Sequence, residues 1–206
     1  MTKSRLEAFT DAVIAIIMTI LVLELAVPKG ASFTDLFAGE NAPMFIAYAV
    51  SFFNLAVYWN NHHHMFHIVK KIDGRVLWTN NIFMFFLSLF PFTTAWMGEH
   101  INSFAPQFIH GVVILGADAA WLAVQIALVK SGGKDSHFAK LYSDYKKNYI
   151  TLALNVIALL AGFIAPILIM IINVGMTMYW ILPERKVEKA VKQCDIEHEK
   201  NKKSGK

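Results

Sequence analysis

The feature that most constrains this chain is the grouping of its apolar residues into blocks long enough to cross a lipid bilayer. The first block runs from Ala8 to Val27 and is interrupted by Thr10, Asp11, Thr19 and Glu24. About twenty helical residues at 1.5 Å each reach about 30 Å, the thickness of the hydrocarbon layer. A cleaved signal peptide has a shorter apolar core without acidic residues at its ends, so we interpret this block as mature structure.

The rest of the chain has the composition of a polytopic membrane protein. Of its 206 residues, 56% are hydrophobic, and the mean hydropathy is +0.45. We predict five further membrane helices, from about Met44 to Lys70, Val76 to Met97, Ala105 to Val129, Tyr149 to Gly162 and Pro166 to Leu182. The prediction is an all-α protein with a six-helix transmembrane domain over residues 1–183 and a charged cytosolic tail over residues 184–206.

The positions of the basic residues predict how the chain is oriented, because cytoplasmic loops carry the excess of Lys and Arg. With six crossings and the N-terminus inside, only Lys29 of the 19 basic residues lies outside. Merging the last two blocks into one helix would place the basic tail outside, so the charge pattern favours six crossings with both termini in the cytoplasm. The outer loops carry Asp35, Glu40 and Glu99, which make that side more favourable to cations than to anions. The net charge of +4 reflects this orientation and indicates no nucleic-acid partner.

The first helix has two different faces. Five branched apolar residues recur at spacings of three and four and therefore share one face: Val13, Ile16, Ile20, Leu23 and Val27. On a helical wheel of about 100° per residue, Asp11 falls nearly opposite Ile20, and Thr19 lies at the edge of the apolar face. An apolar stripe usually packs against lipid or protein, so the spacing alone leaves both that interpretation and a pore-lining role open.

The second helix ends in the run YWNNHHHMFHIVKK, in which histidines three and four residues apart lie on one helical face, as a metal site needs. No Cys, Asp or Glu accompanies them in that helix, so a metal or haem site is the less favoured interpretation. We predict no metal and no cofactor, and instead a polar network between helices two and three that contains Trp59, His63, His64, His67, Trp78 and Asn80.

A carboxylate near the middle of the fourth helix needs a partner, because an ionised Asp at that depth costs about 2.5 to 3.5 kcal/mol on insertion scales. Asp118 is either an ion or proton site or the acceptor of a structural hydrogen bond from a polar group such as Asn155 on the fifth helix. Both interpretations stay open. The sequence has no nucleophile paired with a base and no carboxylate pair at a plausible site, so we predict that the protein is not an enzyme.

The opening helix resembles that of the prokaryotic potassium channels related to transmembrane protein 175. The residues that carry the resemblance are Arg5, Phe9, Thr10 and Asp11 in RLEAFTD, followed by AVIAIIMTILVLELAVP. The family signature is Arg, three residues, Phe, Ser and Asp, and here Thr10 replaces the Ser with another hydroxyl. The resemblance continues through YWNNHHHMF and LWTNNIFMFFLSLFPF and the layout of six crossings, and is most specific in the first helix.

The resemblance implies a homotetramer in the cell membrane whose four first helices line a pore for passive conduction of potassium ions. Alignment with the family places three apolar rings at Ile16, Ile20 and Leu23, with Thr19 as a hydroxyl layer, while Arg5, Phe9, Thr10 and Asp11 pack the helix against its neighbours. A ring of isoleucines at a narrow axis can lose its water and so close the pore. The main alternative is a proton-coupled secondary cation transporter that uses Asp11, Glu24, Asp118 and the histidines as a relay.

Overall fold

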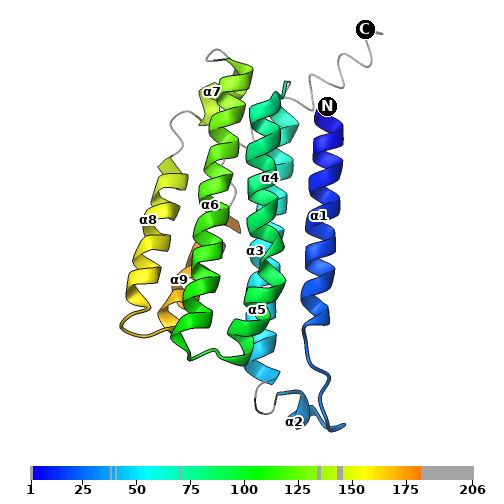
Figure 1. Ribbon diagram of the computed structural model, residues 1–206, viewed down its shortest axis with the longest axis vertical. Coiled ribbons are helices and arrows are strands. Elements are labelled where there is room, and N and C mark those ends of the chain that lie inside the picture. Colours follow the sequence, from blue (N-terminus) through cyan, green and yellow to red (C-terminus); the bar gives the residue numbers. More distant parts are fainter. Residues whose placement is uncertain are drawn as a thin grey trace.

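The computed structural model describes residues 2–37, 39, 41–69, 71–133, 136–142 and 146–181. Over these residues every regular element is a helix (Figure 1), as the sequence predicts. The charged tail predicted for residues 184–206 lies outside the described residues.

Four spans are long and apolar enough to cross a membrane, namely α1, α3, the α4–α5 pair and α6, whereas α8 and α9 have 16 and 15 residues. The helices run α1 Lys3–Leu23, α2 Phe33–Leu36, α3 Asn41–Ile68, α4 Gly74–Ser88, α5 Phe90–Glu99, α6 Phe104–Gly132, α7 His137–Tyr142, α8 Lys146–Ala161 and α9 Ile167–Ile181. The last two apolar blocks therefore form two separate helices joined by a turn around Gly162 and Pro166, as predicted.

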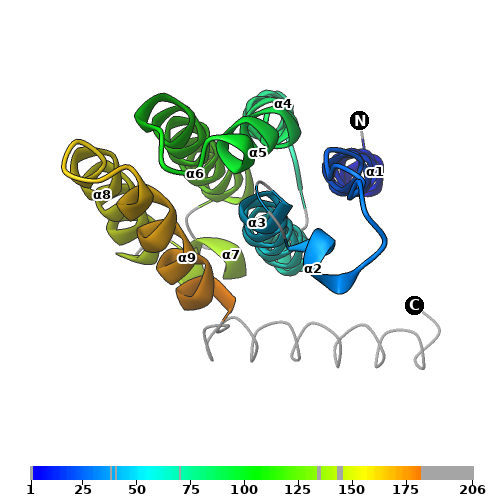
Figure 2. The same cartoon turned by 90° about the horizontal axis from the view of Figure 1, so that it is seen from below.

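The long helices lie side by side along the long axis of the molecule (Figure 1). α6 occupies the centre and contacts α4, α5, α7, α8 and α9. Seen along the bundle, α1 lies at one edge, where it contacts α3, α4 and α5, and the α8–α9 pair lies at the other edge (Figure 2). Among the described residues, the first helix is thus held from one side.

Large apolar side chains close the core between α1, α3, α4 and α6. The largest of the fully buried side chains include Leu6 and Ile14 of α1, Phe66 of α3 and Phe83 of α4. Burying such side chains is worth about 1.5 to 3 kcal/mol each. This core fixes one face of α1 against the bundle.

Basic residues gather at one end of the bundle, where Glu7 and Asp73 also lie. The end where α1 begins and α6 ends, which also carries α7 (Figure 1), holds Lys3, Arg5, Lys71, Arg75, Lys130 and Lys146. The opposite end, which carries α2, holds Lys29, Asp35, Glu99 and His100. At that end Ser32 caps α2, and the hydrogen bonds that its hydroxyl and its backbone N–H donate lower the pKa of the exposed Asp35 carboxyl.

Two helix boundaries reflect proline chemistry. The third apolar block divides at Leu89, because Pro91 lacks the N–H that would continue the helical ladder and begins a new helix more easily. The prediction that α1 continues to Val27 is wrong, since the helix ends at Leu23 and Glu24 caps it. Pro28 restricts the residue before it to extended conformations, which disfavours helix there.

Candidate functional site

The buried face of α1 points into the protomer. It consists of Leu6, Thr10, Ile14, Ile17 and Leu21, which follow one another at spacings of three and four. All five pack against the bundle, so they hold the helix in one rotation about its own axis.

A second face of α1 is apolar and uncovered. The exposed fractions are 56% for Ile16, 40% for Ile20 and 79% for Leu23. The Thr19 hydroxyl, also exposed, donates to the Ile16 carbonyl oxygen at 2.8 Å and keeps its oxygen lone pairs outward. Val13, expected on the same stripe, is instead half-buried against the core. The uncovered stripe therefore begins at Ile16 and ends at Leu23.

Three buried polar side chains connect α1, α3 and α4 on the N-terminal side of this stripe. Asn80 Nδ2 donates to Thr10 Oγ1 at 2.9 Å, and His62 Nε2 donates to Asn80 Oδ1 at 3.1 Å. All three are almost fully buried, and satisfied polar groups in a low-dielectric interior specify one arrangement. The chain of hydrogen bonds therefore fixes the position of α1 relative to its neighbours.

Sequence reasoning named Asn80 and Thr10 but not His62. The signal that would have identified His62 is the periodicity of α3, where Leu55, His62, Met65 and Phe66 all lie on the buried face. This spacing of seven, three and one places His62 among core residues, while His63 is exposed. A wheel drawn for α3 would have separated the two histidines.

A second, more exposed link joins α1 to α3. Trp59 Nε1 donates to Asp11 Oδ1 at 3.0 Å. The His63 ring stacks on Trp59 with 6.2 Å between ring centroids and an interplanar angle of 26°, and its centroid is 6.3 Å from that of His67 and 6.1 Å from that of His64. Asp11 thus faces α3, away from the Ile16 stripe.

The remaining predicted site residues lie on the protomer surface. Trp78 is 72% exposed and lines an open hollow with Leu6, Phe9, Leu77 and Asn81. Trp78 was predicted to share a polar network with Asn80, but Trp78 is exposed whereas Asn80 is fully buried. Arg5 is exposed at the start of α1.

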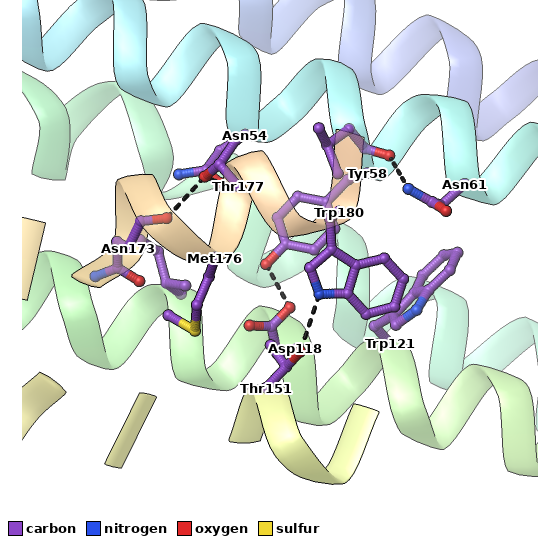
Figure 3. A pocket seen from close by; sticks show the side chains of 12 residues that line it. Asn54, Tyr58, Asn61, Asp118, Trp121, Thr151, Asn173, Met176, Thr177 and Trp180 are labelled. Atoms are coloured by element: carbon purple, nitrogen blue, oxygen red, sulfur yellow. Dashed lines mark hydrogen bonds between the residues drawn. The ribbon is translucent and has the colours of Figure 1, made fainter. Parts of the chain in front are cut away.

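Asp118 lies in a pocket between α3, α6, α8 and α9 (Figure 3). Asn155 Nδ2 donates to its Oδ2 at 2.7 Å, which is the structural hydrogen bond that the sequence left open as one of two interpretations of Asp118. Tyr58 donates its hydroxyl to Oδ1, also at 2.7 Å. Nothing in the sequence indicated Tyr58, because a tyrosine in an apolar helix can face any neighbour.

Comparisons with known proteins agree with this arrangement. The family model described as endosomal/lysosomal potassium channel TMEM175 matches residues 5–91. A protein of Chryseobacterium sp. (strain P1-3) that is named a potassium channel is 36% identical over 193 residues, which cover 94% of this chain and 100% of that protein. The human endosomal/lysosomal proton channel TMEM175 is 31% identical over 101 residues, 44% of this chain and 20% of that protein.

The fold is also that of a solved structure. The crystal structure of a lysosomal potassium-selective channel TMEM175 homolog from Chamaesiphon minutus superposes with a TM-score of 0.70 and covers 87% of this chain and 96% of that one, at 24% identity. Three findings agree, namely a relative that is 36% identical over its whole length, the family model and the shared fold. The chain therefore belongs to the TMEM175 family, whose members are ion channels and not enzymes.

Proposed function

We propose that this chain forms a potassium-preferring cation channel, in which four copies surround a pore lined by their α1 helices. The observation that carries the proposal is the uncovered apolar stripe of Ile16, Ile20 and Leu23 on a helix at the edge of the bundle. Potassium ions are the permeant species, and they cross passively. Membership of a family of ion channels supports this function.

The edge position of α1 supports assembly around this helix. Beside α1 lies the open hollow lined by Phe9, Leu77 and Trp78, an apolar surface that a neighbouring copy can fill. Contacts between two different patches repeat around a ring and close into a cyclic oligomer when the rotation allows it. A ring closed in this way turns the same face of every α1 toward the common axis.

The stripe accounts for closure and for selectivity in physical terms. A narrow ring of Ile16 side chains expels water, so ions cross only after the ring widens. Ile20 and Leu23 add further apolar rings, and Thr19 adds a layer of hydroxyls. Because the sequence has no TVGYG filter, preference for potassium arises when the smaller sodium ion loses more hydration free energy at the apolar ring. This mechanism predicts weaker selectivity than a carbonyl filter.

The polar links of α1 position this stripe. The bonds among Thr10, Asn80 and His62 set the rotation of the helix, and the bond from Trp59 to Asp11 braces it on its other side. A gate has to keep its side chains at a defined distance from the pore axis, and hydrogen-bonded groups of this kind hold the helix that carries them. Arg5 and Phe9, exposed on the protomer, are available for contacts with the next copy.

In this proposal residues 1–183 form one six-crossing channel domain of a multi-pass cell-membrane protein. The shorter α8 and α9 form the last two crossings. The gathering of basic residues at the end where α1 begins supports a cytoplasmic location for that end and for both termini.

The test is a flux assay on reconstituted protein whose copies per particle have been counted by mass. The liposomes are loaded with potassium, and a proton ionophore is added so that entering protons balance the charge of the potassium that leaves. They should lose potassium only when they contain the protein. Sodium-loaded liposomes should lose sodium more slowly. Particles without four copies, or liposomes that retain potassium, would contradict the proposal.

A proton-coupled cation transporter is the second candidate, and one structural feature favours it. The span from Gly74 to Glu99 is interrupted at Leu89, and transporters often place substrate sites at interrupted helices. The residues around the interruption, Leu87 and Phe90, are fully buried and apolar, which disfavours an ion site there. Potassium flux that stops when the proton gradient is clamped would support the transporter instead.

A further inference from the structure

α2 is a formed helix that buries none of its residues, Phe33–Leu36. Ser32 and Asp35 form a capping box, in which the Ser32 N–H donates to Asp35 Oδ2 at 2.9 Å and the Asp35 N–H donates to Ser32 Oγ at 3.3 Å. Asn41 Nδ2 donates to the Asp35 carbonyl oxygen at 2.9 Å, which ties α2 to the start of α3. A helix this short depends on its caps and on packing for stability. Among the described residues α2 has the caps but lacks the packing.

The apolar side chains of α2 and of the loop around it are exposed, and we call them the outer patch. Its members are Val27, Phe33, Leu36 and Phe37. Phe33 is 90% exposed and Phe37 is 59% exposed. Exposed apolar surface of this kind marks an interaction site when several large side chains gather on one element. The patch also follows the α1 stripe along the chain, because Val27 comes shortly after Leu23, the last residue of the stripe.

The outer patch lies beyond the ends of the neighbouring membrane helices. Figure 1 shows α2 past the ends of α1 and α5, at the outer end of the bundle. Acyl chains cover the length that the long helices share, so they do not reach this patch. Helices that lie on a membrane surface carry basic residues on their polar face, whereas α2 carries the carboxylate of Asp35. The patch therefore fits a protein partner better than a lipid surface.

The arrangement around α1 indicates where this partner lies. Seen along the bundle, α2 and α3 lie on one side of α1, and α4 and α5 lie on the other (Figure 2). A ring of identical copies joins two different surfaces of each copy. Around an axis lined by α1, the α2 side of one copy therefore meets the α5 side of the next.

The charges on these two sides are complementary. Lys29 is exposed in the loop before α2, and Glu99 is exposed at the end of α5. Neither side chain has an ion-pair partner among the described residues. Opposite charges at the rim of an interface select which surfaces meet more than they add to affinity. The α2 side and the α5 side thus suit each other in charge as well as in position.

We propose that α2 docks on the next copy of this chain, at the outer end of its α5. The outer patch packs there, and Lys29 faces Glu99 of the next copy. The inference rests on the proposed ring of α1 helices. The contact joins adjacent copies beyond Leu23, where α1 ends, and so fixes the spacing of the outer ends of α1 around the pore.

The test is site-specific photocross-linking of the full chain in liposomes. Phe33→p-benzoyl-phenylalanine keeps an aromatic side chain and, when irradiated, reacts with C–H groups that it contacts. It should give covalent products of two or more chains, whose joined peptides contain position 33 and the end of α5. Phe163→p-benzoyl-phenylalanine is the matched control, because Phe163 is 70% exposed in the turn between α8 and α9, at the opposite edge of the bundle (Figure 2). The control should leave single chains.

A charge reversal tests the same contact without a bulky side chain. Lys29→Glu places a carboxylate opposite Glu99 and should raise the fraction of dissociated chains on the order of tenfold, summed over the contacts of a ring. Lys29→Glu combined with Glu99→Lys should restore the wild-type fraction. The mass of solubilised particles over a dilution series measures both variants.

Four results would overturn the docking of α2. Irradiated position-33 chains that stay single, in particles of wild-type mass, would remove the docking and leave the ring intact. Equal cross-linking from positions 33 and 163 would reduce the contact to random collisions. Joined peptides away from α5, or a double charge reversal that stays dissociated, would contradict the α5 side as the receiving surface. Particles that contain one chain and conduct no potassium would refute the proposed ring, and the docking with it.

Discussion

The uncovered stripe of α1 and the pocket around Asp118 are opposite in chemistry. Among the described residues no helix covers the branched apolar side chains of the stripe, while the pocket lies between four helices and combines amides, hydroxyls and one carboxylate with apolar and aromatic side chains. In water the apolar surface would be the unfavourable feature, but in a bilayer the buried carboxylate is the costly one. The difference teaches that the stripe needs an assembly to have a function, whereas the carboxylate of Asp118 finds its partners, Tyr58 and Asn155, within one protomer.

The largest expected effect on conduction comes from making the stripe polar at its first ring. Ile16→Asn should hydrate the constriction and raise potassium leak on the order of tenfold, equivalent to about 1.4 kcal/mol of barrier. Potassium efflux from liposomes measures it. Ile157→Asn is the matched control, because Ile157 on α8 is 53% exposed, close to the 56% of Ile16. Equal leak in both variants would remove the distinction between the α1 stripe and ordinary lipid-facing surface.

The next effect concerns the buried link that orients the stripe. Asn80→Leu strands Thr10 and His62 without partners, so it should destabilise the protein by about 1 to 3 kcal/mol for each stranded group. The midpoint of thermal unfolding and the yield of assembled oligomer measure the loss. Asn60→Leu, at an exposed position of α3, should stay within about 0.5 kcal/mol of wild type. An unfolding midpoint unchanged by Asn80→Leu would mean that the link does not hold α1.

A smaller effect is expected on the pocket side. Asn155→Leu removes one of the two donors to Asp118 and should destabilise the protein by about 1.5 to 3 kcal/mol, the range for hydrogen bonds to charged groups. Potassium flux through assembled protein should stay at its wild-type value, because the pocket and the stripe belong to different helices. The same preparation provides both measurements. Altered flux at unchanged stability would connect the pocket to conduction and end the contrast drawn above.

The smallest effect should come from the exposed brace of α1. Trp59→Phe keeps an aromatic ring next to His63 but removes the N–H donated to Asp11. The loss should be at most about 0.5 to 1.5 kcal/mol, because water can replace a partner at an exposed site. Thermal unfolding measures it, with Trp96→Phe on α5 as the control. A loss as large as that of Asn80→Leu would show that the brace carries as much of the orientation as the buried link.

Much of the fold follows from local chemistry and could be predicted. Block length and helical periodicity located the membrane helices, and Pro91 accounts for the interruption of the third. The hydrogen bond between Asp118 and Asn155 was also expected, because a carboxylate in the middle of a membrane helix has few polar partners at its depth. These are properties of single segments or of rare residues.

Other features depend on which faces meet. Three adjacent histidines offer three directions around α3, and only packing against α4 and α1 selects His62 for the buried link. The end of α1 at Leu23 and the exposure of Trp78 also differ from a helix treated in isolation. Sequence spacing gives relative directions on one helix, but not the rotation of that helix against its neighbours.

By itself, the sequence determined that this chain forms apolar helices, where they lie, and which family signature opens it, because hydrophobic length, proline chemistry and motif spacing are carried by contiguous residues. Only the tertiary structure decided that α1 buries Thr10 and leaves Ile16 uncovered, and that Asp118 shares a pocket with Tyr58 and Asn173. The physical reason is that each of these outcomes is a contact between segments distant in sequence, and the packing of whole helix faces selects among many rotations that are locally equivalent.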